Sequence, residues 1–173
     1  MQINKSNGIY MILPIIKYPN KNLRKKSQDL SKEQILSPET QGFIVNLIET
    51  MFKEDGLGLA AVQVDKHWNM FAVATEDGPM VFINPKIVYK SWLKETDEEG
   101  CLSVPGVYGL VKRPKTVIIK ALDRNGNKLS MKAKGLFARV LQHEADHTQG
   151  VLFIDKTNKI TRGDDVLREL NTK

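Results

Sequence analysis

The segment His143-Glu144-Ala145-Asp146-His147 has residue types and a spacing that suit metal chemistry. Two histidines four positions apart on a helix project from the same face, one turn above the other. Both imidazoles can therefore reach a single metal ion, and Glu144 lies close enough to act on a water molecule there without being a ligand itself. The alternative interpretation is a polar helix face that contains this pattern by chance.

A catalytic site of this type needs a third protein ligand and one open position. Downstream, the third histidine of the metzincin pattern would fall at Phe153, and the remaining glutamate, Glu169, lies on a short tail. His67 lies in a segment typical of a surface turn. Cys101 remains, and a thiolate with two neutral histidines is a sound ligand set for Fe(II), Zn, Ni or Co. A reactive catalytic thiol with a histidine base is the competing interpretation, but it leaves the pairing of the histidines around Glu144 unexplained.

The segment Gly56-Leu57-Gly58-Leu59-Ala60-Ala61-Val62-Gln63 is a third candidate. Its small residues allow another backbone to approach closely. The glycine spacing does not fit a nucleotide-binding loop. The side-chain amide of Gln63 could donate a hydrogen bond to a developing oxyanion. Taken alone, the segment also fits a helix end that leads into a tight turn.

Two helices are expected around these residues. Ser37 can cap a helix and Pro38 suits its first position. An apolar face at helical spacing follows, and the helix should stop near Gly56. A second helix is expected from about Gly135 to Gln149, with Gly150 placed to end it. It would carry both histidines.

The middle of the chain is rich in short segments typical of strands. Asp123-Arg124-Asn125-Gly126-Asn127 contains Asn-Gly, which predicts a hairpin turn between two of them. A brief strand, Val151 to Ile154, and a short helix within Thr161 to Leu170 are expected near the end. Strands that cluster in the middle, with helices apart from them, favour an α+β fold. The other predicted strands are Met70 to Ala74, Met80 to Ile83, Lys86 to Tyr89, Thr116 to Leu122 and Lys128 to Ala133.

The 173 residues suit a single domain spanning 1–173, with an extension over 1–10 and a tail over 157–173. One cysteine excludes an intramolecular disulfide. The sequence has neither a convincing secretory signal nor an apolar run long enough for a membrane helix, so we expect a cytoplasmic protein with no membrane partner. The net charge is +6, with a dense basic cluster at 21–26. This cluster predicts a solvated loop, and contact with RNA or a ribosome surface is the alternative.

Three motifs together resemble those of the peptide deformylase family. That family carries G-x-G-L-A-A-x-Q, E-G-C-L-S and H-E-x-D-H in this order, and residues 56–63, 99–103 and 143–147 match every fixed position. The resemblance extends over residues 11 to about 156. Thr148 departs from the leucine that is common in the family, which affects packing rather than chemistry. Met11 is a candidate initiator because the first ten residues precede the usual family start.

The resemblance implies a mechanism and a fold. Cys101, His143 and His147 would bind one divalent ion. Glu144 would transfer protons, and the Gln63 amide with the Leu102 backbone N–H would hold the oxyanion. The helix carrying the histidines would lie at the centre of mixed or antiparallel β-sheets. The expected substrate-binding residues are Leu57, Gly58, Leu136 and Val140, and a supporting ion pair between Arg113 and Asp55 is a further expectation.

The resemblance also implies an activity. The enzyme would be a metal-dependent hydrolase that removes the N-formyl group from the initiator methionine of nascent polypeptides and releases formate. Fe(II) is the ion expected in the cell, and Zn, Ni or Co are expected in isolated protein. The partners would be N-formylmethionyl nascent peptides and a ribosome surface, with no specific nucleic acid. A bacterial or phage-infected cell is the expected source, and an organelle is the other compartment that remains open.

Two rival functions are considered. A metalloprotease that cleaves internal peptide bonds would need a third ligand downstream and an open cleft across the chain, and the sequence offers neither. A non-catalytic ribosome- or RNA-binding module would fit the charge of +6. The presence of all the expected catalytic residues argues against the second rival.

Overall fold

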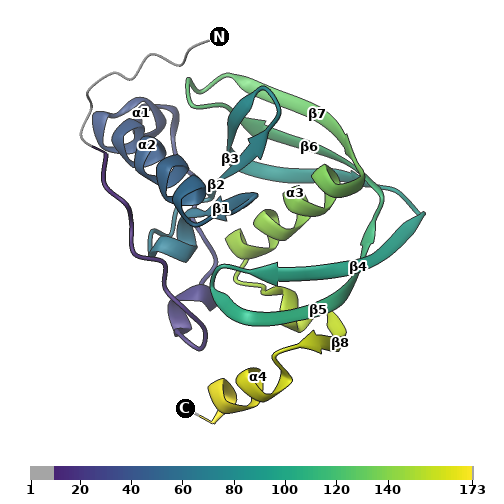
Figure 1. The fold of residues 1–173 in the computed structure, drawn as a ribbon. Coiled ribbons are helices and arrows are strands. Elements are labelled where there is room, and N and C mark those ends of the chain that lie inside the picture. Colours follow the sequence, from purple (N-terminus) through teal and green to yellow (C-terminus); the bar gives the residue numbers. More distant parts are fainter. Residues whose placement is uncertain (1–9, 173) are drawn as a thin grey trace.

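A computed structural model describes residues 10–172 of the chain. The expected extension at 1–10 therefore lies, apart from Tyr10, outside the described residues. A central helix, α3 (Gly135–Thr148), lies between two antiparallel β-sheets (Figure 1). This arrangement confirms the expected α+β class and the central position of the helix that carries the two histidines.

The larger sheet has five strands in the order β1-β2-β3-β6-β7, and each neighbouring pair is antiparallel. The β6–β7 hairpin forms as predicted, because Asp123 Oδ1 accepts hydrogen bonds from the backbone N–H groups of Asn125 and Asn127. Gly126 adopts φ +75°, a left-handed conformation that suits glycine. The strands are β1 (Gly58–Ala60), β2 (Met70–Thr75), β3 (Gly78–Lys90), β6 (Thr116–Leu122) and β7 (Lys128–Lys134).

The smaller sheet has the order β4-β5-β8 and covers the other side of α3. Its strands are β4 (Lys94–Cys101), β5 (Val104–Pro114) and β8 (Thr157–Arg162). The tight turn at Leu102 and Ser103 joins β4 to β5, with Cys101 paired to Val104. This turn places Cys101 at the end of a strand that faces α3.

The helix predicted after Ser37 forms, and a short helix that was not predicted precedes it. The Ser37 side chain accepts a hydrogen bond from Thr40 N at the start of α2 (Pro38–Lys53), and Pro38 occupies the first turn. A short helix, α1 (Lys32–Leu36), precedes it with a capping box at Ser31. The chain also forms the 3₁₀ turns η1 (Lys21–Arg24), η2 (Ala61–Val64) and η3 (Phe153–Asp155) and the final helix α4 (Asp164–Asn171).

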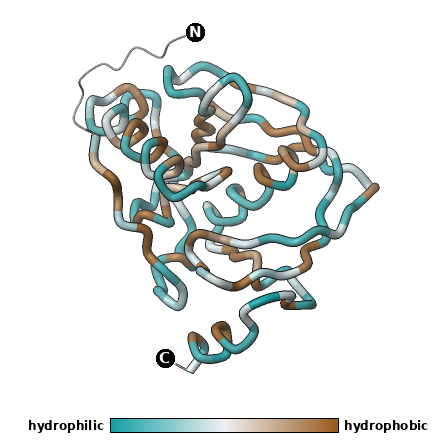
Figure 2. The backbone as a smooth tube through the Cα atoms, in the orientation of Figure 1, coloured by the Kyte–Doolittle hydropathy of each residue, from teal (hydrophilic) through white to brown (hydrophobic). Residues whose placement is uncertain are grey.

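Apolar side chains form a core on each face of the larger sheet and a third one beneath the smaller sheet. Leu47 and Met51 of α2 pack on one face of the five-stranded sheet, and Ala138 and Leu141 of α3 pack on the other. The third cluster joins Val111 of β5 to Phe153 and to partly buried residues of the tail. Figure 2 shows hydrophobic segments gathered on the inner strands and on the inward sides of the helices.

Several predicted elements differ from those observed. The strand expected at Val151–Ile154 was wrong, because the chain there forms the turn η3. The strands expected at Met80–Ile83 and Lys86–Tyr89 are parts of one strand, β3, with a register shift between Ile83 and Lys86. Strands β1, β4, β5 and β8 were not predicted. No helix within residues 10–172 is long and apolar enough to cross a membrane.

Candidate metal and hydrolytic site

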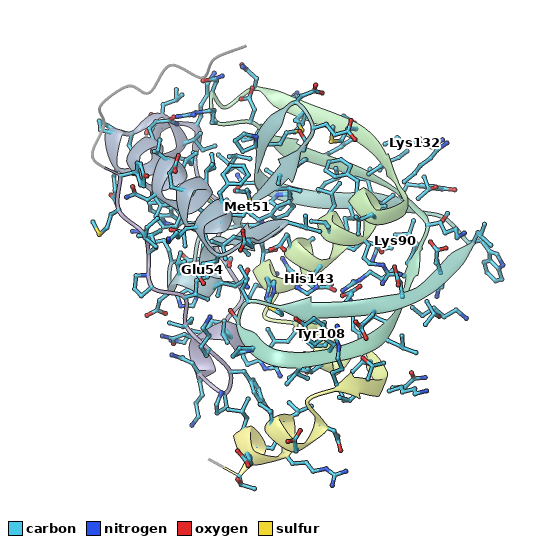
Figure 3. All side chains as sticks on the ribbon, viewed as in Figure 1. Met51, Glu54, Lys90, Tyr108, Lys132 and His143 are labelled. Carbon is cyan, nitrogen blue, oxygen red and sulfur yellow. The ribbon has the colours of Figure 1, made fainter. Side chains whose placement is uncertain are left out.

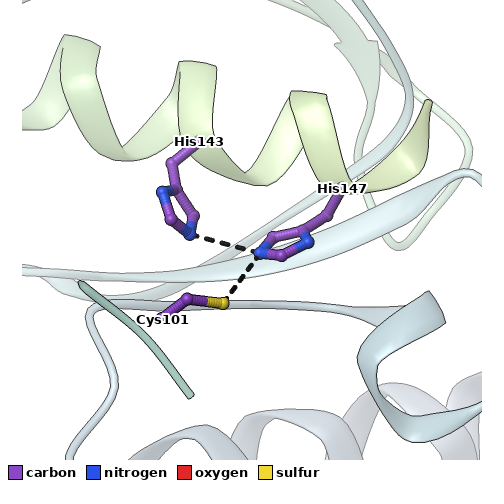
Figure 4. A group of neighbouring side chains, drawn as sticks. All are labelled: Cys101, His143 and His147. Carbon is purple, nitrogen blue, oxygen red and sulfur yellow. Dashed lines mark hydrogen bonds between the residues drawn. The ribbon is translucent and has the colours of Figure 1, made fainter. Parts of the chain in front are cut away.

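Three side chains with metal-binding atoms converge from two elements. Cys101 is the last residue of β4, and His143 and His147 lie one turn apart on α3. Cys101 Sγ lies 3.2 Å from His147 Nε2, which lies 3.2 Å from His143 Nε2 (Figure 4). Their ligand atoms all lie within 4.8 Å of one another.

These separations suit a single tetrahedral ion. Bonds of about 2.0–2.3 Å to nitrogen and sulfur imply ligand atoms roughly 3.3–3.7 Å apart. The observed spacing of 3.2 Å is close to that range. The three donors could hold Zn, Fe(II), Ni or Co, and they leave a fourth tetrahedral position for water or substrate.

A buried carboxylate orients His143. Glu99 Oε2 lies 3.0 Å from His143 Nδ1. When Nδ1 carries the proton and donates to Glu99, Nε2 keeps its lone pair and can bind a metal ion. Arg113 donates to both Glu99 oxygens at 2.5 and 2.8 Å, and Arg139 Nη1 donates to Oε1 at 2.7 Å. Arg113 also donates to Asp146 at 2.7 Å, so the two guanidinium groups offset two carboxylates.

Burial and neighbouring charge change the pKa of several of these groups. Burial would raise the pKa of Glu99, but Arg113 and His143 outweigh it and hold that pKa well below its usual range. Burial would likewise lower the pKa of His143, but Cys101 and Glu99 raise it to about 10. Burial and the charge of His143 lower the pKa of His147. The negative groups that favour a proton on His143 also attract a divalent cation.

Glu144 lies against a glycine. A Cβ built on Gly58 of β1 would lie 2.5 Å from Glu144 Oε1, far inside contact distance. The carboxyl group can therefore occupy this position only because residue 58 has no side chain. Glu144 is buried, its Oε2 has no hydrogen-bond partner within residues 10–172, and burial raises its pKa to about 7. A carboxyl group with such a pKa can gain and lose protons near neutral pH.

Gln63 presents its amide nitrogen to the same site. Its Oε1 accepts a hydrogen bond from Ala60 N at 2.9 Å, which turns Nε2 toward Ser103 Oγ at 3.2 Å and Cys101 Sγ at 3.5 Å. The backbone N–H of Ser103 also lies 3.4 Å from Cys101 Sγ. Lys17 Nζ donates to the carbonyl of Leu102 at 2.7 Å and supports the turn that contains it. Two hydrogen-bond donors from outside the helix, Gln63 Nε2 and Ser103 N, therefore point toward the sulfur.

A pocket of about 570 Å³ opens onto these groups. The four expected substrate-binding residues line it, together with Gln63, Cys101, His143 and Glu144. Leu57 and Leu136 are exposed at its rim. Glu54, Tyr108 and His143 reach it from the end of α2, from β5 and from α3 (Figure 3). An apolar rim above buried polar groups suits a ligand with an apolar side chain and one reactive polar group.

One expected contact was wrong, and others were missed. Arg113 pairs with Glu99 and Asp146 instead of Asp55, which lines the pocket. The packing of Glu144 on Gly58 and the position of Arg139 against Glu99 were not foreseen. A histidine ligand usually donates its second N–H to a carboxylate, which predicts that such a partner exists. Nothing in the sequence indicates that a residue 44 positions away, Glu99, provides it.

Comparisons with known proteins place the chain in one family over most of its length. The family model described as polypeptide deformylase matches residues 12–163. A peptide deformylase of Psychrobacter cryohalolentis is 42% identical over 92% of this chain and 88% of its own. The crystal structure of the Synechococcus elongatus enzyme in complex with actinonin is 36% identical, with a TM-score of 0.82 over 99% of this chain and 88% of its own. The Met-Ala-Ser-bound Acinetobacter baumannii enzyme is 30% identical, with a TM-score of 0.82 over 86% of this chain and 99% of its own.

Proposed function

The chain belongs to the peptide deformylase family and removes the N-formyl group from nascent polypeptides, and we propose that Cys101, His143, His147 and Glu144 carry out this hydrolysis. The observation that carries the assignment is the convergence of one sulfur and two Nε2 atoms beside a buried carboxyl group. No other group within residues 10–172 brings three histidine, cysteine or carboxylate ligand atoms together as a metal site.

Two of the three proposed ligands have a supporting hydrogen bond, whereas His147 Nδ1 is buried without a partner among residues 10–172. Gln63 and Ser103 donate toward Cys101 Sγ, and Glu99 fixes the ring of His143. Helix α3 sets the spacing between His143 and His147. A divalent ion bound there supplies positive charge that lowers the pKa of water toward about 7 and stabilises negative charge on oxygen. The residues fit such an ion because the donor types and their separations both suit it.

Glu144 is the proposed general base and acid. Its carboxylate takes a proton from the attacking water as a bond forms between the water oxygen and the formyl carbon. The same carboxyl group then gives that proton to the departing amine as the C–N bond breaks, releasing formate. Gly58 permits this position, because any side chain there would displace the carboxyl group.

Two hydrogen-bond donors are proposed for the oxyanion. The Gln63 amide nitrogen is directed into the pocket by the Ala60 backbone, and the Leu102 backbone N–H belongs to the turn beside Cys101. A donor that is already oriented costs no reorganisation when charge develops on the substrate. Losing one such donor typically costs about 3 kcal/mol of transition-state stabilisation.

The pocket accounts for the proposed substrate selectivity. Leu57, Leu136 and Val140 supply apolar surface for the methionine side chain. The extended peptide pairs with backbone near Gly58, in the manner of an added strand. Glu144 and Gly58 are closely packed beside the histidines, so the space at the reacting carbon is small. A formyl group fits there, whereas the extra methyl of an acetyl group does not.

The finer assignments are part of the same proposal. Fe(II) is the proposed ion in the cell, and zinc, nickel or cobalt can take its place in isolated protein because the same donors accept all four. The cytoplasm is the proposed compartment. The proposed partners are N-formylmethionyl nascent chains and the surface of the ribosome from which they emerge.

Formate release from formyl-Met-Ala-Ser tests the proposal. Protein reconstituted anaerobically with Fe(II) or with nickel is assayed as wild type, Cys101→Ala and Glu144→Gln, with the bound metal measured in each. Glu76→Gln, which changes an exposed carboxylate in the β2–β3 turn, is the matched control. Acetyl-Met-Ala-Ser serves as the substrate that should be rejected.

Each variant has a distinct expected result. Cys101→Ala loses both the metal and the activity, whereas Glu144→Gln keeps the metal and loses nearly all turnover. The Glu76 control keeps both. A fully active Glu144→Gln enzyme would refute its role as the proton carrier, and a Cys101→Ala protein with unchanged metal affinity would refute the ligand set.

A further inference from the structure

The face of the five-stranded sheet that points away from α3 is only partly covered. Helix α2 packs on it over β1, β2 and β3. In β6, Val117, Ile119 and Ala121 pack toward α3. Side chains alternate along a strand, so Ile118 and Lys120 point to the opposite side. That side of β6 and β7 is hereafter called the open face.

Lysines dominate the open face. Lys120 is paired in register with Lys86 of β3 and with Ser130 of β7, so these three residues share one side of the sheet. The exposed residues of β7 alternate with buried or half-buried ones that pack toward α3. The open face therefore carries five exposed lysines: Lys86, Lys120, Lys128, Lys132 and Lys134. Figure 3 shows Lys132 extending outward from β7.

Within residues 10–172, no carboxylate forms an ion pair with these five lysines, although Asp29 and Asp146 line the pocket that Lys86 borders. Strands β3, β6 and β7 contain no aspartate or glutamate. Within residues 10–172, the lysines that pair with carboxylates are Lys66, Lys115 and Lys156, none of which lies on the open face. Lys32 of α1 lies beside Gly126 at the β6–β7 turn and adds a further positive charge at that end.

Large apolar side chains lie at the opposite end of the same strands. Tyr89 is paired with Ile118 and lies on the open face, half exposed. The turn after β3 carries Trp92, which is 98% exposed, and Leu93, which is 65% exposed. The Trp92 indole makes almost no contact with the rest of the protein, so its position contributes almost no packing energy to the folded state. Aromatic rings next to a basic surface are the pattern on which nucleic-acid bases stack.

We propose that the open face binds RNA without sequence preference. The five lysines contact successive phosphates, and Tyr89 and Trp92 stack on exposed bases at the edge of the sheet. This inference does not depend on the metal site, which lies on the other side of α3 between that helix and β4. An extended polyanion fits better than an anionic membrane because the charge spreads across three strands instead of surrounding the apolar turn.

Binding of a fluorescein-labelled single-stranded RNA of about 20 nucleotides and mixed sequence tests the proposal. Fluorescence anisotropy is measured over a salt series with the full-length, metal-loaded enzyme. The test variant is the triple substitution Lys86→Glu, Lys120→Glu and Lys132→Glu. The control is Lys21→Glu, Lys25→Glu and Lys159→Glu, which lowers the net charge equally at exposed residues outside strands β3, β6 and β7. Formate release and circular dichroism establish that every variant is folded.

Five phosphate contacts predict a slope of log affinity against log salt of about −3.5, and removing three contacts reduces its magnitude by about 2. The control keeps the wild-type slope. Trp92→Ala leaves the slope unchanged and weakens binding by about tenfold, as expected for lost stacking. Formate release is unchanged in all of them.

Three results would overturn the proposal. Equal losses in the two triple variants would mean that net charge alone attracts RNA. Undiminished RNA binding by the open-face variant would place the binding site elsewhere. Binding to phosphatidylglycerol vesicles in place of RNA, lost in the Trp92 and open-face variants, would identify a membrane surface as the ligand.

Discussion

The substitution Gly58→Ala tests whether the position of Glu144 controls the rate, because it should shift that carboxyl group without removing the metal. The added Cβ would lie 2.5 Å from Oε1 and 2.7 Å from Cδ and Cγ of Glu144. Ordinary contact begins at about 3.4 Å, so the carboxyl group must shift by roughly 1 Å. A shift of this size in a reacting group can cost about a hundredfold in rate. This loss corresponds to about 2.7 kcal/mol of activation free energy.

Steady-state formate release measures the effect, and the bound metal is quantified in the same samples. We expect kcat to fall about a hundredfold while the metal content stays at the wild-type level, because the new methyl group lies against Glu144 and not against the ligands. Gly42→Ala is the matched control, since a Cβ there has nothing within 4 Å. It should leave kcat unchanged and raise the free energy of unfolding by up to about 1 kcal/mol, because alanine favours the interior of α2.

The kinetic constants separate this explanation from a simpler one. If Gly58 mattered only for pairing with the peptide backbone, Gly58→Ala would raise KM and leave kcat nearly unchanged. Unchanged kcat would therefore refute the reasoning that the bare Cα holds Glu144 in place. Parallel loss of metal and activity would refute it as well.

The remaining predictions concern the groups around the proposed ligands. Gln63→Leu should lower kcat about 10²–10³-fold with the metal retained, as measured by formate release, because an oxyanion donor is lost; an unchanged kcat would contradict that role. Arg113→Met should lower the free energy of unfolding in urea by about 3–5 kcal/mol because it leaves Glu99 buried without its main partner. Adding Glu99→Gln to that variant should recover part of the loss, and a double variant no more stable than the single one would argue against the pairing. Dialysis against a chelator should abolish activity and lower the melting temperature, and returning Ni or Fe(II) should restore both.

Capping and turn residues correctly predicted where several helices and one hairpin begin or end. Ser37 and Pro38 at the start of α2, Gly150 beyond the end of α3 and Asn125-Gly126 between β6 and β7 act within a few positions of themselves. Their effects could therefore be predicted without knowing the rest of the fold.

The strands of the smaller sheet were not predicted because they form through pairing with one another in the folded protein. Strand β4 reads Lys-Glu-Thr-Asp-Glu-Glu-Gly-Cys, and β8 reads Thr-Asn-Lys-Ile-Thr-Arg, so neither has a clear alternation of apolar and polar residues. Each forms by pairing with an edge of β5. Strand propensity depends strongly on such context. The segment Val151–Ile154 shows the converse, since its apolar run leads into the 3₁₀ turn η3 and does not form a strand.

The candidate site was predictable in its residue types but not in its supporting contacts. Helical spacing predicted the two histidines as metal ligands. Cys101 was predicted as the third ligand from its chemistry and from the resemblance to a family. The approach of Gly58 to Glu144 joins residues 86 positions apart, and the Glu99 carboxylate reaches a histidine 44 positions away. Contacts of this kind depend on how β1, β4 and α3 pack together, which no local pattern encodes.

Anomalous diffraction from crystals of the cobalt- or zinc-loaded protein tests the proposed metal centre most directly. One strong peak is expected at about 2.3 Å from Cys101 Sγ and about 2.0–2.1 Å from the Nε2 atoms of His143 and His147. Glu144 should lie outside bonding distance of that peak. A peak ligated by Glu144 in place of Cys101, or one at a different group of residues, would contradict the account.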